Sequence, residues 1–421
     1  MSGVVLKNII AKGNKVSYDY ECPLSWNDYF VKNEGNLFFE YDFNVESVPK
    51  SLLAVPFVAN MLTVAMFENT VIEVEELDKS FYECIPNVVN GFKKIYPRID
   101  FAYQIVAKKL VDNSYEITEN KLLAFTGGLD ATSAFATVDK NNLTLVNIWG
   151  ADVKLNMIDR HNYQMKYFLD FSKKYDCDFK LIKSNLRFIF NGSKIPYTKY
   201  FSTDWWCAVS HTVAIITAFT PLIFKLKTKS VYLGSTYKDD LEFHDDANNV
   251  LIVNQIKIAN CQDIRVVDDD LKRIDKIENI SKKLSVSEKN PINIFACWNH
   301  DNVIEGNCCD CEKCFRTIME IKSQKLNPID FGFNVDENTY LKIKDYIKTH
   351  KVGVSFWKEI QNEYLSDKNF WKKDKNLKWI LTIKFNKQKL VFFKKILRFF
   401  VLVKRKFQAE IKKIKNKNER K

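Results

Sequence analysis

The sequence predicts an α/β protein whose main domain is a doubly wound parallel sheet. From Lys121 onward, short apolar runs alternate with segments long enough for crossover helices, which is typical of βαβ units. A pair of glycines follows the first of these runs, where a strand would turn into a helix. The chain of 421 residues exceeds one ordinary domain, so we expect three regions. These are an α+β accessory domain over 1–116, the sheet domain over 117–330 and a helical basic region over 331–421.

The accessory region is expected to contain short strands, such as Leu37–Phe43, and one helix over 50–67. Its apolar stretch Ser51–Phe67 falls just short of the ~18 residues of a membrane span and contains Pro56 and Asn60. We therefore predict a buried helix for this stretch rather than a membrane span.

Four apolar runs predict the strands of the sheet domain: Leu122–Phe125, Leu143–Trp149, Phe179–Ile182 and Ser230–Gly234. The segment between the second and third runs has a helical repeat, with three apolar members expected to face the core: Met165, Phe168 and Leu169, followed by Ser172. Between the third and fourth runs, Trp205 to Lys225 predicts a buried helix that Pro221 kinks or ends.

The composition is that of a globular protein, with 46% hydrophobic and 28% charged residues, which excludes disordered and collagen-like classes. The first residues, MSGVVLKNIIAKGNK, lack the continuous apolar stretch of a secretory signal, so we expect a cytoplasmic location. Residues 371–421 hold 19 Lys and Arg against 3 Asp and Glu, whereas the first 370 residues hold 45 against 49. The net charge of +12 therefore arises in the tail.

A glycine loop, Thr126–Asp130, joins the first predicted strand to a helix that continues with Ala131, Thr132 and Ser133. Adjacent glycines let the backbone approach a phosphate closely, and a helix N-terminus offers unpaired N–H groups and a partial positive charge. The loop lacks both the Gly-Lys-Ser/Thr of a Walker A loop and the G-x-G-x-x-G spacing of a dinucleotide fingerprint. An anion-binding loop is predicted. The alternative is a plain strand-to-helix turn with Asp130 as a surface or capping carboxylate.

This loop resembles the Ser-Gly-Gly-x-Asp-Ser motif of the PP-loop ATP pyrophosphatase family, with Thr126 for the first serine and Ala131 for the last. The resemblance implies an adenine nucleotide alpha hydrolase-like fold, cleavage of ATP between its α- and β-phosphates, and a requirement for Mg2+. It implies catalytic roles for Thr126, Asp130 and Ser133. The nucleotide-binding residues that it implies are Thr126, Gly127, Gly128, Leu129, Asp130, Thr132, Trp149 and Gly234. Thr132 or Ser133 would replace the hydroxyl that Ala131 lacks.

Two further strand ends belong to the expected nucleotide site. In the resembled family the adenine lies against the end of the second strand, here Asn147–Gly150, where backbone groups hold it. The fourth strand ends at Gly234, and the carboxyl ends of strands in a doubly wound sheet converge on the ligand crevice. Asp239 and Asp240 could therefore reach the substrate or a magnesium ion. A solvated acidic turn that continues to Asp246 is the alternative.

Five of the ten cysteines crowd into 297–314, and four of them have the spacing C-x10-C-x2-C-x2-C: Cys297, Cys308, Cys311 and Cys314. Short C-x2-C steps let neighbouring thiolates converge on one tetrahedral ion, which predicts a structural zinc site. The alternatives are an iron–sulfur cluster, free thiols, a disulfide, or His300 in place of one cysteine.

The order of the two motifs resembles the cyano-deazaguanine synthases of queuosine biosynthesis, which carry a cysteine followed by Cys-Gly-x-Cys-x-x-Cys. Cys309 stands where that motif has glycine. The resemblance covers about 121–321, half of the chain, and implies a ligase with ATP, Mg2+ and Zn2+. This chain adds about 120 residues before the matched part and about 100 after it, so the deazaguanine substrate does not carry over with the fold.

The function expected from these motifs is adenylation: ATP would activate a carboxylate or amide oxygen of a small molecule for attack by a nitrogen nucleophile. One alternative is a non-catalytic nucleotide-binding protein with structural zinc. Another is sulfur transfer through Cys177, Cys207 or Cys261, although a cysteine of this kind is more often a buried core residue.

The tail from Leu390 to Lys421 alternates apolar residues with clusters of lysine and arginine. Four apolar residues could share one helical face: Leu390, Phe393, Leu397 and Phe400. The pattern fits three roles: a helix on the anionic inner face of a membrane, a packing helix, or a nucleic-acid contact. The first two are preferred equally, and the third less. The oligomeric state is left open.

Overall fold

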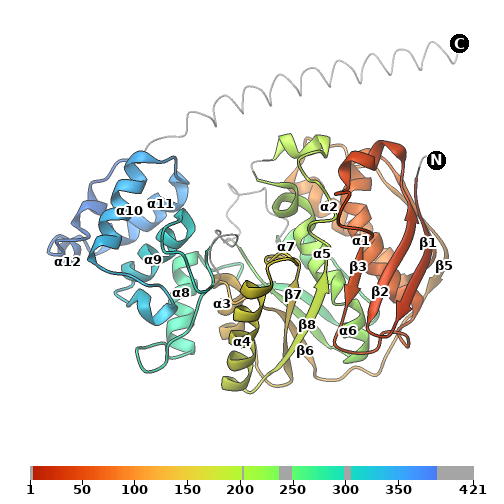
Figure 1. Ribbon diagram of the computed structural model, residues 1–421, viewed down its shortest axis with the longest axis horizontal. Coiled ribbons are helices and arrows are strands. Elements are labelled where there is room, and N and C mark those ends of the chain that lie inside the picture. The colour runs from red at the N-terminus through yellow and green to blue at the C-terminus, as the bar shows by residue number, and fades with distance from the viewer. Residues whose placement is uncertain (1–2, 202, 237–248, 298–304, 386–421) are drawn as a thin grey trace, which may run out of the picture. The chain divides into compact units, whose positions relative to one another are not determined.

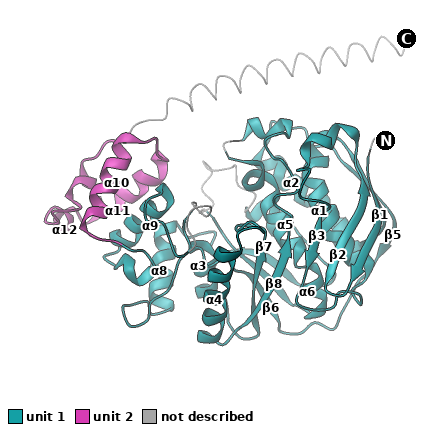
Figure 2. Ribbon diagram, viewed as in Figure 1, with its two compact units in different colours: residues 1–334 teal, residues 335–421 magenta. Residues whose placement is uncertain are grey.

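The computed structural model describes residues 3–201, 203–236, 249–297 and 305–385. The chain forms two compact units, residues 1–334 and 335–421 (Figure 2). Strands from residues 1–116 and strands from residues 117–330 join the same sheet of the first unit. Each unit is built around its own core.

A ten-stranded sheet dominates the first unit (Figure 1). Its strands are β1 Gly3–Lys12, β2 Lys15–Glu21, β3 Phe38–Glu40, β4 Val71–Asp78, β5 Gln104–Val111, β6 Lys121–Ala124, β7 Leu143–Trp149, β8 Asp178–Ser184, β9 Ser230–Gly234 and β10 Asp263–Val267. The spatial order is β10-β9-β6-β7-β8-β3-β2-β1-β4-β5. β10 through β8 are parallel to one another, as are β1, β4 and β5, whereas β3 and β2 make the antiparallel connection. The predicted α/β class with a mostly parallel sheet is confirmed.

The winding of the sheet changes direction beside β6. The chain passes from β6 to β7 and β8 on one side, and then returns to β9 and β10 on the other. Such a reversal is the switch point of a doubly wound sheet, where ligands bind outside the carboxyl ends of the strands. The predicted strands Leu143–Trp149 and Ser230–Gly234 are confirmed with these bounds.

Helices cover both faces of the parallel part of the sheet. In the first unit they are α1 Lys50–Glu68, α2 Lys79–Ile95, α3 Leu129–Thr137, α4 Ile158–Lys174, α5 His211–Ala218, α6 Thr220–Lys225, α7 Val250–Val253, α8 Arg273–Lys283 and α9 Glu312–Ser323. The short 3-10 and π segments are η1 Leu24–Tyr29, η2 Pro196–Tyr200, η3 Trp206–Ser210 and η5 Pro328–Phe331. Leu122 and Ala124 of β6 join the core cluster that includes α1, α5 and α6. Since alternate residues of a strand face opposite sides, Phe125 meets Phe135 of α3 and Phe171 of α4 on the other face.

Two helical stretches among the described residues are long and apolar enough to pass a test for membrane spans, Lys50–Glu68 and Trp206–Lys225. Most of each lies inside the protein, 94% and 83% of the tested windows, which is how the core helices of a folded domain behave. The predicted buried helix over 50–67 is confirmed as α1. The second stretch is interrupted at Phe219, and Pro221 lies in the first turn of α6, where a missing N–H costs no hydrogen bond.

The buried face of α4 differs from the predicted one. Leu169 is 44% exposed, and the buried residues are Arg160, His161, Gln164, Phe168, Phe171 and Ser172. The prediction of an apolar stripe through Leu169 is therefore wrong. It failed because polar side chains on the buried face are held by specific partners, as described below, and these partners are far away in the sequence.

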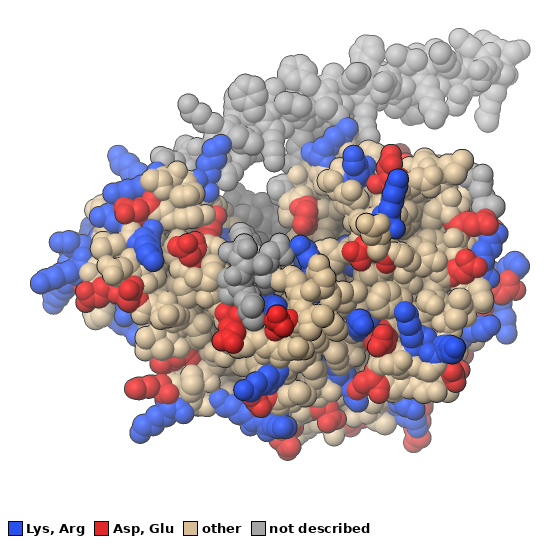
Figure 3. All heavy atoms as spheres, viewed as in Figure 1, with Lys and Arg blue, Asp and Glu red and all other residues tan. Residues whose placement is uncertain are grey.

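The second unit is a small helical body. Its elements are α10 Glu337–Thr349, α11 Val354–Ser366, α12 Lys368–Trp371 and η6 Lys378–Leu381. Trp357, Tyr364 and Trp371 form its centre, and Gln361 donates to the carbonyls of Ile380 and Ile383, at 2.7 and 3.0 Å. Five lysines around α12 are exposed, and basic side chains gather there in Figure 3: Lys368, Lys372, Lys373, Lys375 and Lys378. The predicted tail helix from Leu390 lies outside the described residues.

Candidate functional site: a glycine loop and a cysteine cluster

The glycine loop leaves β6 at the switch point and leads into α3. Gly127 has φ +68°, a left-handed conformation that favours glycine. The Thr126 hydroxyl accepts a hydrogen bond from the Gly128 amide at 3.3 Å, which closes the turn. The first hydrogen bond of α3 runs from the Thr132 amide to the Gly128 carbonyl at 2.9 Å. The amides of Leu129 to Ala131 therefore belong to the open N-terminal end of the helix.

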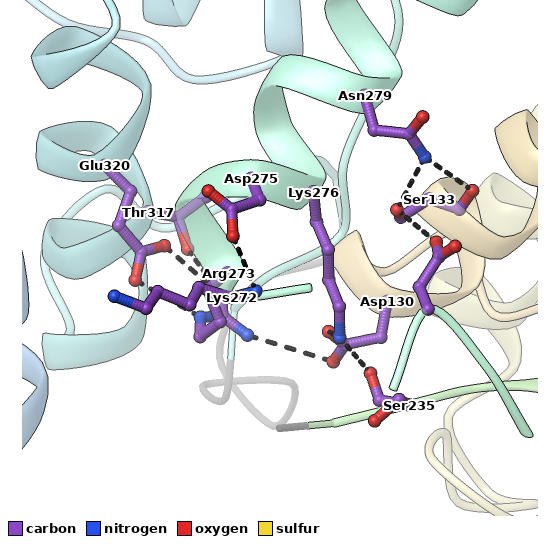
Figure 4. A network of polar contacts seen from close by, with 11 residues as sticks. Asp130, Ser133, Ser235, Lys272, Arg273, Asp275, Lys276, Asn279, Thr317 and Glu320 are labelled. Carbon is purple, nitrogen blue, oxygen red and sulfur yellow. Dashed lines mark hydrogen bonds and ion pairs between the residues drawn. The ribbon is translucent and has the colours of Figure 1, made fainter. Parts of the chain in front are cut away.

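Asp130, in the first turn of α3, is held by two cations of α8 (Figure 4). Its carboxylate lies 3.1 Å from the Lys276 ammonium and 3.8 Å from the Arg273 guanidinium. Lys276 is fully buried and also donates to the Ser235 carbonyl, just beyond β9. Asp130 is therefore not a freely solvated surface carboxylate, because its ion pair with Lys276 connects α3 to α8 and, through Ser235, to the end of β9.

Arg273 is in turn fixed by α9. Its Nε lies 3.2 Å from Glu320, and its NH2 group lies 3.5 Å from the Thr317 hydroxyl. Burial and the nearby guanidinium of Arg273 lower the pKa of Lys313, also on α9, while Asp130 raises it. Two cationic side chains of α8, Arg273 and Lys276, therefore lie beside Asp130 at the end of α3. An anion at this helix end would be favoured by both the amides and the cations.

Ser133 points to a second polar network on the same helix. Its hydroxyl donates to Asp268 at 2.5 Å and accepts from the Asn279 side chain at 3.1 Å. Asp268 follows β10 and has φ +62°. Because Ser133 is fully buried and so engaged, it braces α3 against β10 and α8. Thr132 is buried too, and its hydroxyl has no hydrogen-bond partner within the described part of the chain.

Sequence reasoning missed Arg273, Lys276 and Asp268. The only local signal was the apolar pair Val266–Val267, followed by three aspartates and then by Lys272 and Arg273. This order fits a fifth strand whose carboxyl end lies at the same edge of the sheet as the glycine loop. Asp239 and Asp240, proposed from the sequence, lie outside the described residues.

Gly234 allows β9 to approach the loop. A Cβ atom at this position would lie 2.4 Å from the Asp130 carbonyl oxygen, closer than any real contact. Gly234 is therefore beside the loop, as its expected nucleotide-binding role requires, and its contact in the structure is with α3.

Trp149 ends β7 in a closed aromatic stack. Its ring lies parallel to the His161 ring at 3.8 Å, the Lys183 ammonium lies over it at 5.2 Å, and its Nε1 donates to the Lys154 carbonyl at 3.1 Å. Burial, with a contribution from Lys183, lowers the pKa of His161 to about 4. The ring of Trp149 is thus occupied, which leaves its backbone as the part that could meet an adenine.

The four predicted metal ligands converge. The sulfur atoms of Cys297, Cys308, Cys311 and Cys314 all lie within 4.8 Å of one another. Cys308 and Cys314 are 3.7 Å apart, close to the roughly 3.8 Å that tetrahedral zinc with Zn–S bonds of about 2.3 Å requires. The cluster could therefore hold a metal such as zinc. His300 lies outside the described residues.

The cluster has supporting hydrogen bonds outside the ligands. The Asn307 side chain accepts from the amides of Ala296 and Cys297, at 2.9 and 3.1 Å, and donates to the Ile294 carbonyl at 2.8 Å. The Asp310 amide points to the Cys308 sulfur at 3.4 Å. These contacts surround the ligand segments, and such outer partners orient metal ligands in general.

Without a cation the thiols resist ionisation. Hydrogen bonds to Cys297 and Cys311, followed by burial, raise the pKa of Cys314 far above its usual value. Burial is the main cause that raises the pKa of Cys308 to about 12. Four thiolates in this arrangement need a positive ion, which zinc supplies.

Two of the three cysteines considered for sulfur transfer, Cys177 and Cys261, are poor nucleophiles here. Burial raises the pKa of Cys177 and of Cys261 to about 11, so neither forms a thiolate readily. Cys207 is partly buried at the start of the Trp206–Ser210 turn.

Comparisons with protein-family models, with curated proteins and with solved structures found no match. The functional argument therefore depends on the chemistry of the residues themselves.

Proposed function

We propose that this protein is a PP-loop ATP pyrophosphatase that adenylates a small-molecule acceptor. The observation that supports this most is the position of the glycine loop at the switch point of the sheet, with its open helix end beside Arg273 and Lys276. Polyphosphates suit such a place, because amides donate to phosphate oxygens and cations neutralise their charge.

The reaction would proceed in two displacements. An acceptor carboxylate or amide oxygen attacks the α-phosphorus of ATP, and the bond from that phosphorus to the bridging oxygen breaks. Pyrophosphate leaves with the electron pair, beside the amides of Leu129 and Asp130. A nitrogen nucleophile then attacks the activated carbon, and AMP and a proton leave, giving an amide from a carboxylate or an amidine from an amide. A nitrile would form instead when an adenylated primary amide loses AMP and a proton without a second nucleophile. Positioning and charge stabilisation are the main contributions asked of the protein.

Each cofactor has candidate residues. Asp130 is the carboxylate that would hold magnesium, which supplies further positive charge to the phosphates when bound. The four-cysteine cluster would hold zinc as a structural ion. No disulfide joins the ten cysteines, all of which lie in the described part of the chain, and we propose a reducing cytoplasm as the location.

A second candidate is a nucleotide-binding protein without turnover. Two observations favour it: Ala131 lacks the hydroxyl of the resembled motif, and the Ser133 hydroxyl is already bonded to Asp268. Binding through amides and cations would survive both features.

Gly128→Val tests the proposal. Gly128 has φ −72°, which any residue adopts, and an added Cβ would press only on the Thr126 hydroxyl, at 3.3 Å. The fold should therefore be retained while phosphate approach is blocked. Asp130→Ala is a less clean test, because it would leave the buried Lys276 ammonium without its carboxylate.

The assay follows the products of ATP with magnesium and candidate acceptors. The wild type is expected to release AMP and pyrophosphate, and Gly128→Val to lose at least roughly 100-fold of that rate at an unchanged unfolding midpoint. Leu24→Ala, at a side chain of η1 that is 83% exposed, serves as the control. ADP and phosphate as products would contradict the proposal, and ATP binding without any product would favour the second candidate.

A further inference from the structure

We infer that the cysteine cluster and the glycine loop form one coupled unit, so that metal binding by the four cysteines sets the conformation of the loop. Two independent sets of contacts connect them. Binding of a polyphosphate at the loop rests on the proposed function, whereas the coupling between the metal site and the loop does not depend on it.

The first link runs through Phe295, two residues before Cys297. Its amide donates to the Gly127 carbonyl at 2.8 Å. Its ring packs so closely on the loop that a Cβ at Gly127 would lie 2.7 Å from it. The segment that carries the first metal ligand is therefore also the segment that fixes the glycine with positive φ.

Arg160 and Asn307 make this link rigid. Arg160 is buried, its guanidinium lies over the Phe295 ring at 5.5 Å, and it donates to the Gly306 carbonyl at 2.9 Å. Asn307, the residue just before Cys308, accepts a hydrogen bond from the Cys297 amide at 3.1 Å. The segments that carry Cys297 and Cys308 are thus both held next to Phe295. This accounts for a charged residue on the buried face of α4.

The second link runs along α9. Cys311 is its N-cap and Cys314 lies in its first turn, so the metal ligands set the start of this helix. Thr317 and Glu320 follow at successive steps of three residues, on neighbouring turns of one side. They hold Arg273, whose guanidinium reaches Asp130 at 3.8 Å. Displacing α9 would therefore pull a cation away from the loop.

Loss of the metal should release both links together. Four thiols that share no cation lose the attraction that holds Cys297 next to Cys308, Cys311 and Cys314. Phe295 and α9 would then be free to move separately. Because coupling between two binding events is reciprocal, a polyphosphate on the loop and a metal on the cysteines would strengthen each other, by roughly tenfold for typical couplings.

Amide hydrogen exchange of the full chain tests the coupling without any nucleotide. After zinc is removed by a chelator, peptides that cover 125–131 are expected to exchange at least roughly tenfold faster, together with 297–314. The β1–β2 hairpin, residues 3–21, is the internal reference and should not change. Fast exchange confined to 297–314, with 125–131 unaffected, would overturn the inference.

Phe295→Ala keeps the test valid if zinc removal unfolds the whole unit. It retains all four ligands, so zinc-loaded protein with one zinc per chain can be compared directly with the wild type. Faster exchange of 125–131 in the zinc-loaded variant is expected, and the exposed Phe370→Ala serves as the matched control. Unchanged exchange at the loop would overturn the inference. Failure of the pyrophosphate assay with the exchange result intact would remove only the proposed function.

Discussion

Cys309 shows how a single dihedral angle explains a departure from a motif. It stands where the resembled cysteine motif has glycine, and its φ is +52°, in the left-handed region. Its sulfur is not among the four that converge. The backbone therefore keeps the conformation that glycine would provide, and the extra thiol is not required for metal binding.

Cys309→Gly is accordingly expected to retain one zinc and to unfold at the same or a slightly higher urea concentration. Relief of the left-handed strain in the folded state raises the free energy of unfolding by about 1–2 kcal/mol. The extra chain entropy of glycine in the unfolded state lowers it by about 0.5–1 kcal/mol. Cys308→Ser, at the neighbouring ligand, should lose zinc and much of the stability of the first unit. Elemental analysis and urea unfolding measure both, and loss of zinc from Cys309→Gly would make Cys309 a ligand.

His161 predicts a pH dependence of stability. Burial lowers its pKa from 6.5 to about 4, so the unfolded chain binds this proton first as the pH falls. Stability is therefore present above pH 6.5 and is lost as the pH drops towards 4. His161→Phe should reduce the slope of unfolding free energy against pH by up to about 1.4 kcal/mol per pH unit in this window. An unchanged slope between pH 6 and 4.5, measured by urea unfolding, would mean that His161 is protonated in the folded protein.

At the residue scale, local motifs predicted what local sequence encodes. The glycine loop and the four cysteines could be found because their members are close in sequence. Lys276 lies 146 residues from Asp130, and Asp268 lies 135 from Ser133, so no spacing rule could pair them. Such pairs are specified only by the order of the strands.

At the element scale, β9 and α3 approach each other closely beside the glycine loop. Gly234→Ala would place a Cβ against the Asp130 carbonyl, and neither backbone can yield without moving an element. We expect a loss of roughly 1–3 kcal/mol in unfolding free energy, typical of overpacking. Gly128→Ala, with ordinary φ and a 3.3 Å contact to a hydroxyl, is the matched control and should change stability little. Equal stability of the two variants, by urea unfolding, would show that β9 can separate from α3.

Strands of the parallel sheet were predictable because they are buried on both faces and so form continuous apolar runs, as in β7 and β9. The buried face of α4 was not, because Arg160 and His161 are buried there through contacts with Gly306 and Trp149. Hydrophobic periodicity assumes that the core accepts only apolar groups. That assumption fails beside the glycine loop and the cysteine cluster, where polar groups have fixed partners.

At the scale of the whole molecule, the sheet is larger than the sequence suggested. Five strands from the first 116 residues extend it beyond β8 through the antiparallel β3. β3 has three residues, and its contact with β8 consists of Phe39 and Glu40 opposite Ser184 and Lys183. A joint this short carries little sequence signal, which is why the accessory region looked like a separate unit.

The distribution of charge along the whole chain leads to the last prediction. Residues 371–421 carry a net charge of +16, from 19 basic and 3 acidic residues. Four of the exposed lysines around α12 belong to this basic region and lie in the described part of the second unit: Lys372, Lys373, Lys375 and Lys378. We expect the full chain to float with anionic vesicles at low salt and to be released at high salt, because surface attraction is screened within about 10 Å at 0.1 M. A chain ending at Phe385 should stay unbound, and Lys372→Glu with Lys373→Glu should weaken binding of the full chain. Neutral vesicles are the control. A positive net charge attracts any polyanion, so charge alone does not separate membrane binding from nucleic-acid contact. Equal recovery of the full and shortened chains in the unbound fraction would eliminate membrane binding and leave packing or nucleic-acid contact as the role of the tail.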